Sequence, residues 1–180
     1  MNRLLVIVAA ALLLAAGAAG LMLVFGARDE PGVAAATGPG EVFADQCAEH
    51  RRRPKGFRFR SDPPTSGPHV PVPVRRDGRR LTTDQLLHAL ELGNVVVTYD
   101  GARPPAALRR LQVSVAGRFD PELAAAGQAI VLARSDRPGI AALAWRHRLT
   151  ARSAGDPRLA EFAEHWLGRG FAGAGAPNCS

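Results

Sequence analysis

The sequence predicts an N-terminal transmembrane helix followed by one small extracytoplasmic domain of the α+β class, in which helices cover a partly antiparallel sheet. Two observations lead to this fold class. Residues 4–26 carry no charge, and at about 1.5 Å per residue they are long enough to cross a bilayer. From residue 46 onward, segments with helical periodicity alternate with short apolar runs, over enough chain for one compact domain.

Composition divides the chain into three segments. Residues 1–26 are expected to form the anchor, residues 27–45 a flexible linker rich in Gly, Ala and Pro, and residues 46–180 the domain. A cleaved signal peptide is the alternative for the first segment, with residues 16–18 as the cleavage site. The apolar run continues to Phe25, beyond such a site, and this favours an uncleaved anchor.

The domain is expected to contain, in order, a helix, a strand, two helices, two strands and a helix. Thr82 can cap the first helix, Gln85 completes a capping box, and Gly93 ends the helix. The strand at residues 94–99 has too many valines for a half-exposed edge, so we expect it in the sheet interior. The later elements are predicted at residues 104–117 (helix), 120–126 (short helix), 128–133 (strand), 140–150 (one strand) and 156–167 (helix).

Two cysteines, Cys47 and Cys179, bracket the predicted domain. A pair in this arrangement indicates a disulfide formed in an oxidising compartment, and closing so long a loop would stabilise the fold by roughly 5 kcal/mol. The alternative is two unrelated buried thiols. With the disulfide, the sequence predicts a single-pass protein of the cell membrane whose C-terminal domain is extracytoplasmic.

The formal net charge of +7 does not lead us to expect a nucleic-acid partner. Of the 23 basic residues only Lys55 is a lysine, a bias typical of a GC-rich genome. Two basic clusters, at residues 51–60 and 75–80, would instead attract anionic lipid head groups or cell-wall polymers. Phe57 and Phe59 interleave the first cluster in a pattern compatible with stacking on bases. A plain solvated surface is the alternative.

A pair of side chains on the first helix carries the candidate metal chemistry. His88 and Glu91 are three residues apart, hence neighbours on one helix face, and Asp84 lies on that face too. The pair could share a metal ion, or the carboxylate could fix the tautomer of the imidazole. The alternative is a polar helix face with a weak ion pair.

The stretch SDPPTSGPH, residues 61–69, offers a third ligand. Its prolines restrict the backbone, so that the segment can hold His69 in one direction. We expect either a rigid corner in which His69 is a satisfied hydrogen-bonding residue, or a site in which His69 joins His88 and Glu91 on a divalent metal, Zn or Cu. No catalytic residue is assigned, since no nucleophile elbow surrounds Ser66.

The three other histidines have separate expectations. His147 falls on the apolar side of its strand and is expected to be packed and hydrogen-bonded, although it or His165 could complete the metal site. His165 is expected in a surface pair with Glu161, one helical turn away. His50 lies within the first basic cluster and is expected on the surface.

Three stretches together resemble a membrane-anchored actinobacterial family, the one catalogued as domain of unknown function 3105. The resemblance covers roughly residues 45–177, and it rests on the stretches PPTSGPH (63–69), HALELGNVVVTY (88–99) and ALAWRHRLT (142–150). It implies that His69, His88 and Glu91 are family-pattern positions. No established activity comes with the family name.

The same resemblance implies a difference at one position. The family helix typically reads His-x-Leu-Glu-His-Gly, and Leu92 replaces its second histidine here. Histidines at i and i+4 with an intervening Glu are typical of inverted zinc-peptidase helices. Because Leu92 cannot bind a metal, we do not expect a peptidase. The favoured function is a binding or interaction module of the cell envelope, and the alternative is a metal-binding protein or metal-dependent enzyme.

Overall fold

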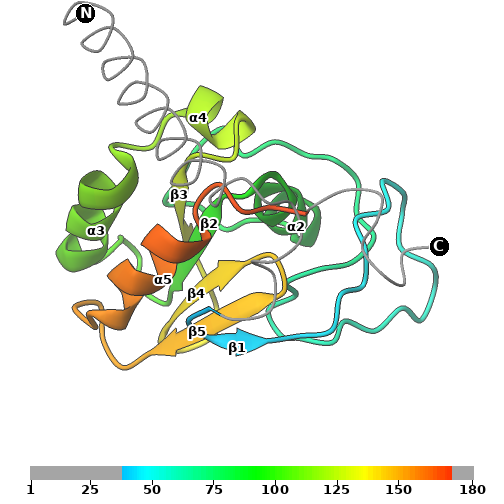
Figure 1. Ribbon diagram of the computed structural model, residues 1–180, viewed down its shortest axis with the longest axis horizontal. Helices are drawn as coiled ribbons and strands as arrows, with labels where there is room; N and C mark the ends of the chain where they lie inside the picture. Colours follow the sequence, from blue (N-terminus) through cyan, green and yellow to red (C-terminus); the bar gives the residue numbers. More distant parts are fainter. Residues whose placement is uncertain (1–37, 172–180) are drawn as a thin grey trace, which may run out of the picture. The chain divides into compact units, whose positions relative to one another are not determined.

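The computed structural model describes residues 38–171, which form an α+β domain around a mixed five-stranded sheet (Figure 1). The strand order is β1-β5-β4-β2-β3; β2 and β3 are parallel and the other neighbours are antiparallel. The strands are β1 (Glu41–Val42), β2 (Val95–Tyr99), β3 (Ile130–Arg134), β4 (Ile140–Ala144) and β5 (His147–Ala151).

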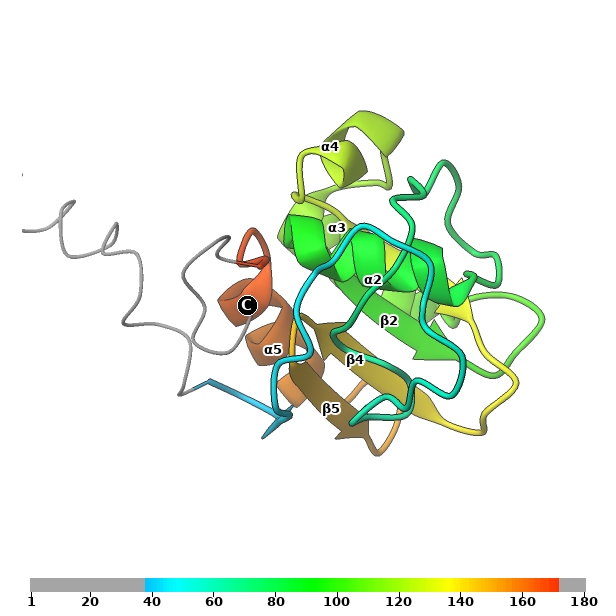
Figure 2. The ribbon, with the colours of Figure 1, turned by 90° about the vertical axis from the view of Figure 1, so that its right-hand side faces the viewer.

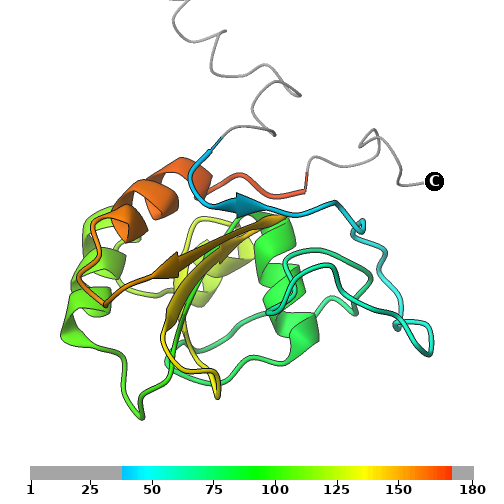
Figure 3. The same ribbon diagram turned by 90° about the horizontal axis from the view of Figure 1, so that it is seen from below.

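Helices cover both faces of this sheet (Figure 3). α2 (Thr83–Leu92) packs on one face, next to the short α4 (Pro121–Ala125), while α3 (Ala106–Ala116) and α5 (Arg158–Trp166) pack on the other. β2 contributes to both cores, since Val96 is buried with the α2 side and Val95 and Val97 with the α3–α5 side. The prediction that this valine-rich strand is interior is therefore confirmed.

The fold class needs one correction. The described domain is α+β with a mixed sheet, but the predicted transmembrane helix is not part of it. Among the helices of residues 38–171, none combines the length and the apolar character needed to cross a membrane. The segment for which the sequence predicts the anchor, residues 1–26, lies outside the described residues.

The predicted single strand at residues 140–150 is in fact two. β4 and β5 form a hairpin that turns at Trp145 and Arg146, with Ala144 paired to His147. Arg146 has a positive φ of 65°, which favours Gly or Asn, so the sequence carries no signal for this turn. Its backbone N–H donates to the carbonyl oxygen of Thr65 at 3.0 Å, which ties the hairpin to the SDPPTSGPH stretch.

The N-terminal edge of the described chain is also structured. β1 lies inside the segment predicted as a linker and pairs with β5, where Arg148 bonds Glu41 at 2.8 Å. The remainder of that segment, up to residue 37, lies outside the described residues. The disulfide stays a prediction, because Cys179 lies outside them as well.

A long irregular segment connects β1 to α2 and runs over the outer side of α2 (Figure 2). Within this segment, the backbones of His50 and His69 pair in a single parallel β-bridge. Further along, the segment covers the outer edge of β3 through backbone hydrogen bonds. The N–H of Gly78 donates to the carbonyl oxygen of Leu132, and the carbonyl oxygen of Arg79 accepts from the N–H of Arg134. The segment therefore positions histidines beside α2 and closes an open sheet edge.

Candidate metal centre

The capping and burial of α2 determine where its polar residues point. The Thr82 hydroxyl accepts from the N–H of Gln85, the Gln85 side chain accepts from the N–H of Thr82, and Gly93 ends the helix with a φ of 105°. The apolar residues of the helix are buried, namely Leu86, Leu87, Ala89 and Leu90, and all but Leu87 belong to the core on this face of the sheet. His88 and Glu91 consequently lie on the outer side, beneath the irregular segment.

The SDPPTSGPH stretch is a buried, internally bonded corner. Ser61 bonds both the backbone N–H and the hydroxyl of Thr65, and the hydroxyl of Ser66 accepts from the N–H of Gln46. Gly67 has a φ of 131°, and a Cβ there would lie 3.0 Å from the ring of Phe59. The corner is therefore rigid, as the sequence predicts.

This corner fixes the orientation of His69, whose side chain is fully buried. Its Nδ1 lies 2.9 Å from the carbonyl oxygen of Gly67, and its backbone N–H donates to the carbonyl of Glu49. A carbonyl oxygen only accepts hydrogen bonds, so the ring proton of a neutral His69 belongs on Nδ1. The lone pair of Nε2 then points at the carboxylate of Glu91, 3.1 Å away.

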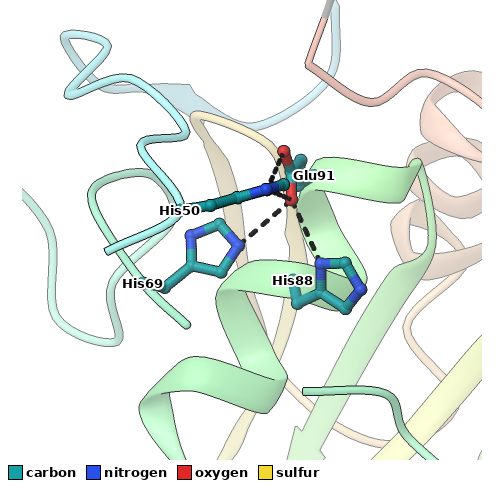
Figure 4. A group of neighbouring side chains, drawn as sticks. All are labelled: His50, His69, His88 and Glu91. Atoms are coloured by element: carbon teal, nitrogen blue, oxygen red, sulfur yellow. Dashed lines mark hydrogen bonds and ion pairs between the residues drawn. The ribbon is translucent and has the colours of Figure 1, made fainter. Parts of the chain in front are cut away.

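Two more imidazoles meet the same carboxylate (Figure 4). Nδ1 of His88 lies 3.1 Å from Oε2 of Glu91, and Nε2 of His50 lies 2.8 Å and 3.0 Å from its two oxygens. The side chain of His50 is 51% exposed, against 16% for His88 and 14% for Glu91. Three of the four side chains are thus largely shielded from solvent, and His50 is the exposed one.

The four side chains have the spacing of a metal site. One ligand atom from each of His50, His69, His88 and Glu91 can be chosen so that all lie within 4.8 Å of one another. Two ligands of a tetrahedral zinc ion, each about 2.1 Å from it, lie about 3.4 Å apart, so a shared ion requires ligand atoms as far apart as 4.8 Å to approach by up to about 1.4 Å. His50, which is 51% exposed, is the least constrained of the four side chains.

The charge state of Glu91 suits a cation. Burial by itself raises the pKa of this carboxyl, but hydrogen bonds from His50 and His88 and the nearby charges of His50 and His69 outweigh it and hold the pKa below 4.5. The side chain is therefore a carboxylate at neutral pH. It supplies the negative charge of the ligand set, since imidazoles bind a metal ion in their neutral form.

The chain after α5 holds the C-terminal end of α2 in place. The backbone N–H of Phe171 donates to the carbonyl of Glu91 at 2.8 Å, and that of Gly168 to the carbonyl of Gly93 at 2.8 Å. A Cβ on Gly170 would lie 2.0 Å from the carbonyl oxygen of Glu91. This close approach requires glycine and fixes the backbone that carries the carboxylate.

The structure brings together all three residues of the predicted site, His69, His88 and Glu91, and adds a fourth. His50, expected on the surface as one of a basic cluster, is the addition. Nothing in the local sequence indicates this, because the contact depends on the bridge between His50 and His69. Asp84 does not join: it pairs with Arg53 at 2.5 Å and accepts from the N–H of Val70.

Neither of the other two histidines reaches the cluster. His147 is buried and stacks on Trp166 with ring centroids 3.7 Å apart. Its Nδ1 has no hydrogen-bond partner among the described residues, contrary to the expectation of a hydrogen-bonded histidine. His165 meets Trp166 edge to face with ring centroids 4.5 Å apart, and its Nε2 is likewise buried without a partner in the described part of the chain.

Leu92 occupies the helix position next to the cluster and is 36% exposed. It lies one turn after His88, at the position where the resemblance described above implies a second helical histidine. The third imidazole beside Glu91 comes from His50 instead. The cluster therefore has three imidazoles although Leu92 offers no ligand atom.

Comparisons with known proteins identify one relationship. A family model described as "Protein of unknown function (DUF3105)" matches residues 50–177, a range that begins at His50 and includes the whole cluster. No curated protein and no solved structure is significantly similar to the chain.

Proposed function

The chain belongs to the family of unknown function DUF3105, and from the geometry of its histidine cluster we propose that it binds one divalent transition-metal ion. The ligands are His50, His69 and His88 with the carboxylate of Glu91. The observation that carries the proposal is the direction of the His69 ring.

With Nδ1–H donated to Gly67, a neutral His69 presents a lone pair to Glu91, itself ionised. Two such acceptors 3.1 Å apart repel each other unless a proton or a metal ion lies between them. A metal-ligating histidine characteristically donates its other ring N–H to a backbone carbonyl or carboxylate, which fixes the tautomer. His69 has this arrangement.

The donor set indicates the class of metal. Imidazole nitrogens with one carboxylate suit Zn(II), Cu(II), Fe(II) or Ni(II), and the absence of sulfur among the four side chains disfavours Cu(I). In most sites of this composition Cu(II) binds more tightly than Zn(II). Four protein ligands complete a tetrahedral shell, which favours a structural or metal-carrying role over hydrolysis.

Metal analysis of the full-length protein tests this proposal. Chelator-treated protein is equilibrated with Zn(II) or Cu(II), freed of unbound metal and analysed; we expect one equivalent in the wild type. We expect His88→Ala to lose it and His165→Gln, a histidine variant outside the cluster, to retain it. Wild-type protein that retains no metal would overturn the proposal, as would equal loading of the wild type and His88→Ala.

A second candidate, an interaction module for anionic polymers, is supported by the exposed basic residues of the irregular segment. These are Arg51, Arg52, Lys55, Arg58 and Arg60. Phe57 and Phe59 pack against each other with ring centroids 5.2 Å apart, and Phe59 lies under Gly67, which favours a structural role over base stacking. Replacing Arg51 and Arg52 with Gln should lower the salt concentration that elutes the protein from a polyanion column; unchanged elution contradicts this function.

A further inference from the structure

The four proposed metal ligands differ in their exposure to solvent. The side chain of His50 is 51% exposed, whereas those of the other three ligands are at most 16% exposed. The ring of His69 is fully buried. A molecule in solution therefore reaches the cluster at His50.

The ring of His50 is also held by fewer hydrogen bonds than that of His69. Its Nε2 bonds only to Glu91, and its Nδ1 makes no hydrogen bond within residues 38–171. His69, by contrast, is fixed at Nδ1 by the carbonyl oxygen of Gly67. When His50 leaves a bound ion, His69, His88 and Glu91 remain, and three protein ligands with one open position are a common zinc arrangement. His50 is therefore the ligand that an incoming molecule can replace.

The surface around His50 is strongly positive. Residues 49–60 carry six basic side chains against one acidic side chain. Ion pairs with Glu49 and Asp84 use two of the basic side chains. The other four are exposed and make no ion pair among the described residues, namely Arg52, Lys55, Arg58 and Arg60. A bound divalent ion adds to this charge, since its two positive charges exceed the single negative charge of Glu91. Such a surface repels free metal cations and attracts anions.

Arg52 is the nearest of these four basic residues along the chain. It lies two residues after His50, so their Cα atoms are at most about 7 Å apart. This distance is shorter than the Debye length of about 8 Å at physiological salt. The charge of Arg52 therefore acts on a molecule that approaches His50, without any direct contact.

We propose, building on the metal binding proposed above, that the cluster exchanges its ion with small polycarboxylate chelators at His50. A carboxylate oxygen of the chelator forms a bond to the ion as the bond from Nε2 of His50 breaks. The ion keeps its charge, and further chelator oxygens then replace the three remaining ligands. The reverse sequence loads the site from an anionic metal chelate.

Zinc transfer from the loaded full-length protein to two tripodal chelators tests the proposal. Nitrilotriacetate is anionic and tris(2-pyridylmethyl)amine is neutral; the zinc left on the protein is measured after rapid desalting at a series of times. We expect the transfer rate to rise with the nitrilotriacetate concentration, because the chelator attacks the bound ion. This rate should fall as salt is raised, because salt screens the attraction between opposite charges, whereas the rate with the neutral chelator should not change.

A charge reversal locates the approach of the chelator. Arg52→Glu should slow transfer to nitrilotriacetate about fivefold at about 0.01 M salt and should equal the wild type at about 1 M salt. Arg110→Glu, the same reversal at an exposed position of α3, is the control and should transfer zinc at the wild-type rate. Circular dichroism checks that each variant is folded.

The outcomes separate this route from metal binding itself. A wild type that holds no zinc overturns the proposed function, and the exchange with it. Release at a rate independent of chelator concentration overturns the replacement of His50 by the chelator, while metal binding stands. Equal salt dependence for the two chelators, or a wild-type rate for Arg52→Glu, overturns the preference for anionic chelators.

Discussion

The ring of His69 donates from Nδ1 to the carbonyl oxygen of Gly67 at 2.9 Å, and this one contact decides which nitrogen faces the cluster. Because Gly67 adopts a φ of 131° above the ring of Phe59, the contact depends on the conformation of the corner. The backbone conformation of residues 61–69 therefore fixes the orientation of the His69 ring, one of the proposed metal ligands.

Gly67→Ala should therefore weaken metal binding by about 10–100-fold, the usual effect of disturbing a partner that orients a ligand. The added Cβ meets Phe59 at 3.0 Å and is strained at this φ. Competition with a chromophoric chelator measures the affinity. Gly139→Ala, also at positive φ but with open space around its Cβ, is the matched control and should bind metal normally.

Metal should also stabilise the folded protein. A ligand that binds only the native state at 100 times its Kd adds about 2.7 kcal/mol to the free energy of unfolding. Differential scanning calorimetry should show a higher Tm with Zn(II) for the wild type and an unchanged Tm for His50→Ala. His50 is half exposed, so its removal should leave the metal-free Tm nearly unaltered. Equal Zn(II)-induced shifts in both proteins would contradict its role as a ligand.

Gly170→Ala should lower the free energy of unfolding by about 2 kcal/mol or more, a size typical of overpacking or a broken buried contact. Its Cβ would lie 2.0 Å from the carbonyl oxygen of Glu91, so the bond from Phe171 to that oxygen has to break. Urea unfolding measures the change. Gly155→Ala, where the Cβ meets nothing within 4 Å, should differ little from the wild type.

His147 should make the fold sensitive to acid. Burial above all, helped by the positive charge of Arg146 and the proximity of His165, lowers the pKa of His147 from 6.5 to about 4. The unfolded chain therefore takes up this proton first as the pH falls. The contribution of His147 is complete above pH 6.5 and is lost progressively toward pH 4, by up to about 3 kcal/mol.

Urea titrations at several pH values test this dependence. His147→Phe keeps a ring against Trp166 without a titrating group, and its unfolding free energy should fall less between pH 6.5 and 4. His165→Gln controls for the neighbouring histidine. An identical pH profile for His147→Phe and the wild type would show that His147 is not responsible.

Local sequence signals predicted most of the regular elements. The capping box at Thr82, the valine-rich strand and the amphipathic last helix all lie where periodicity and capping placed them. The hairpin was missed because Arg146 adopts a positive φ without being Gly or Asn. Its conformation depends on bonds to Thr65 and Phe43, which are far away in the sequence.

Of the four residues in the cluster, the sequence predicts three, because short-range patterns identify only these. His88 and Glu91 share a helix face, and His69 ends a stiff turn, so short-range patterns indicate them. His50 comes to the cluster through backbone contacts of the irregular segment, including the bond from His69 to the carbonyl of Glu49. No spacing rule connects these positions, since their proximity is a property of the fold.

Long-range ¹H–¹⁵N spectra of the histidine rings, recorded while the metal-free protein is titrated with Zn(II), test whether an ion lies between the His69 ring and Glu91. We expect that Nε2 of His50, Nε2 of His69 and Nδ1 of His88 shift together and saturate at one equivalent, while the nitrogens of His147 and His165 stay unchanged. Unchanged resonances of His69 and His88 at saturating Zn(II), or shifts confined to His147 and His165, would contradict it.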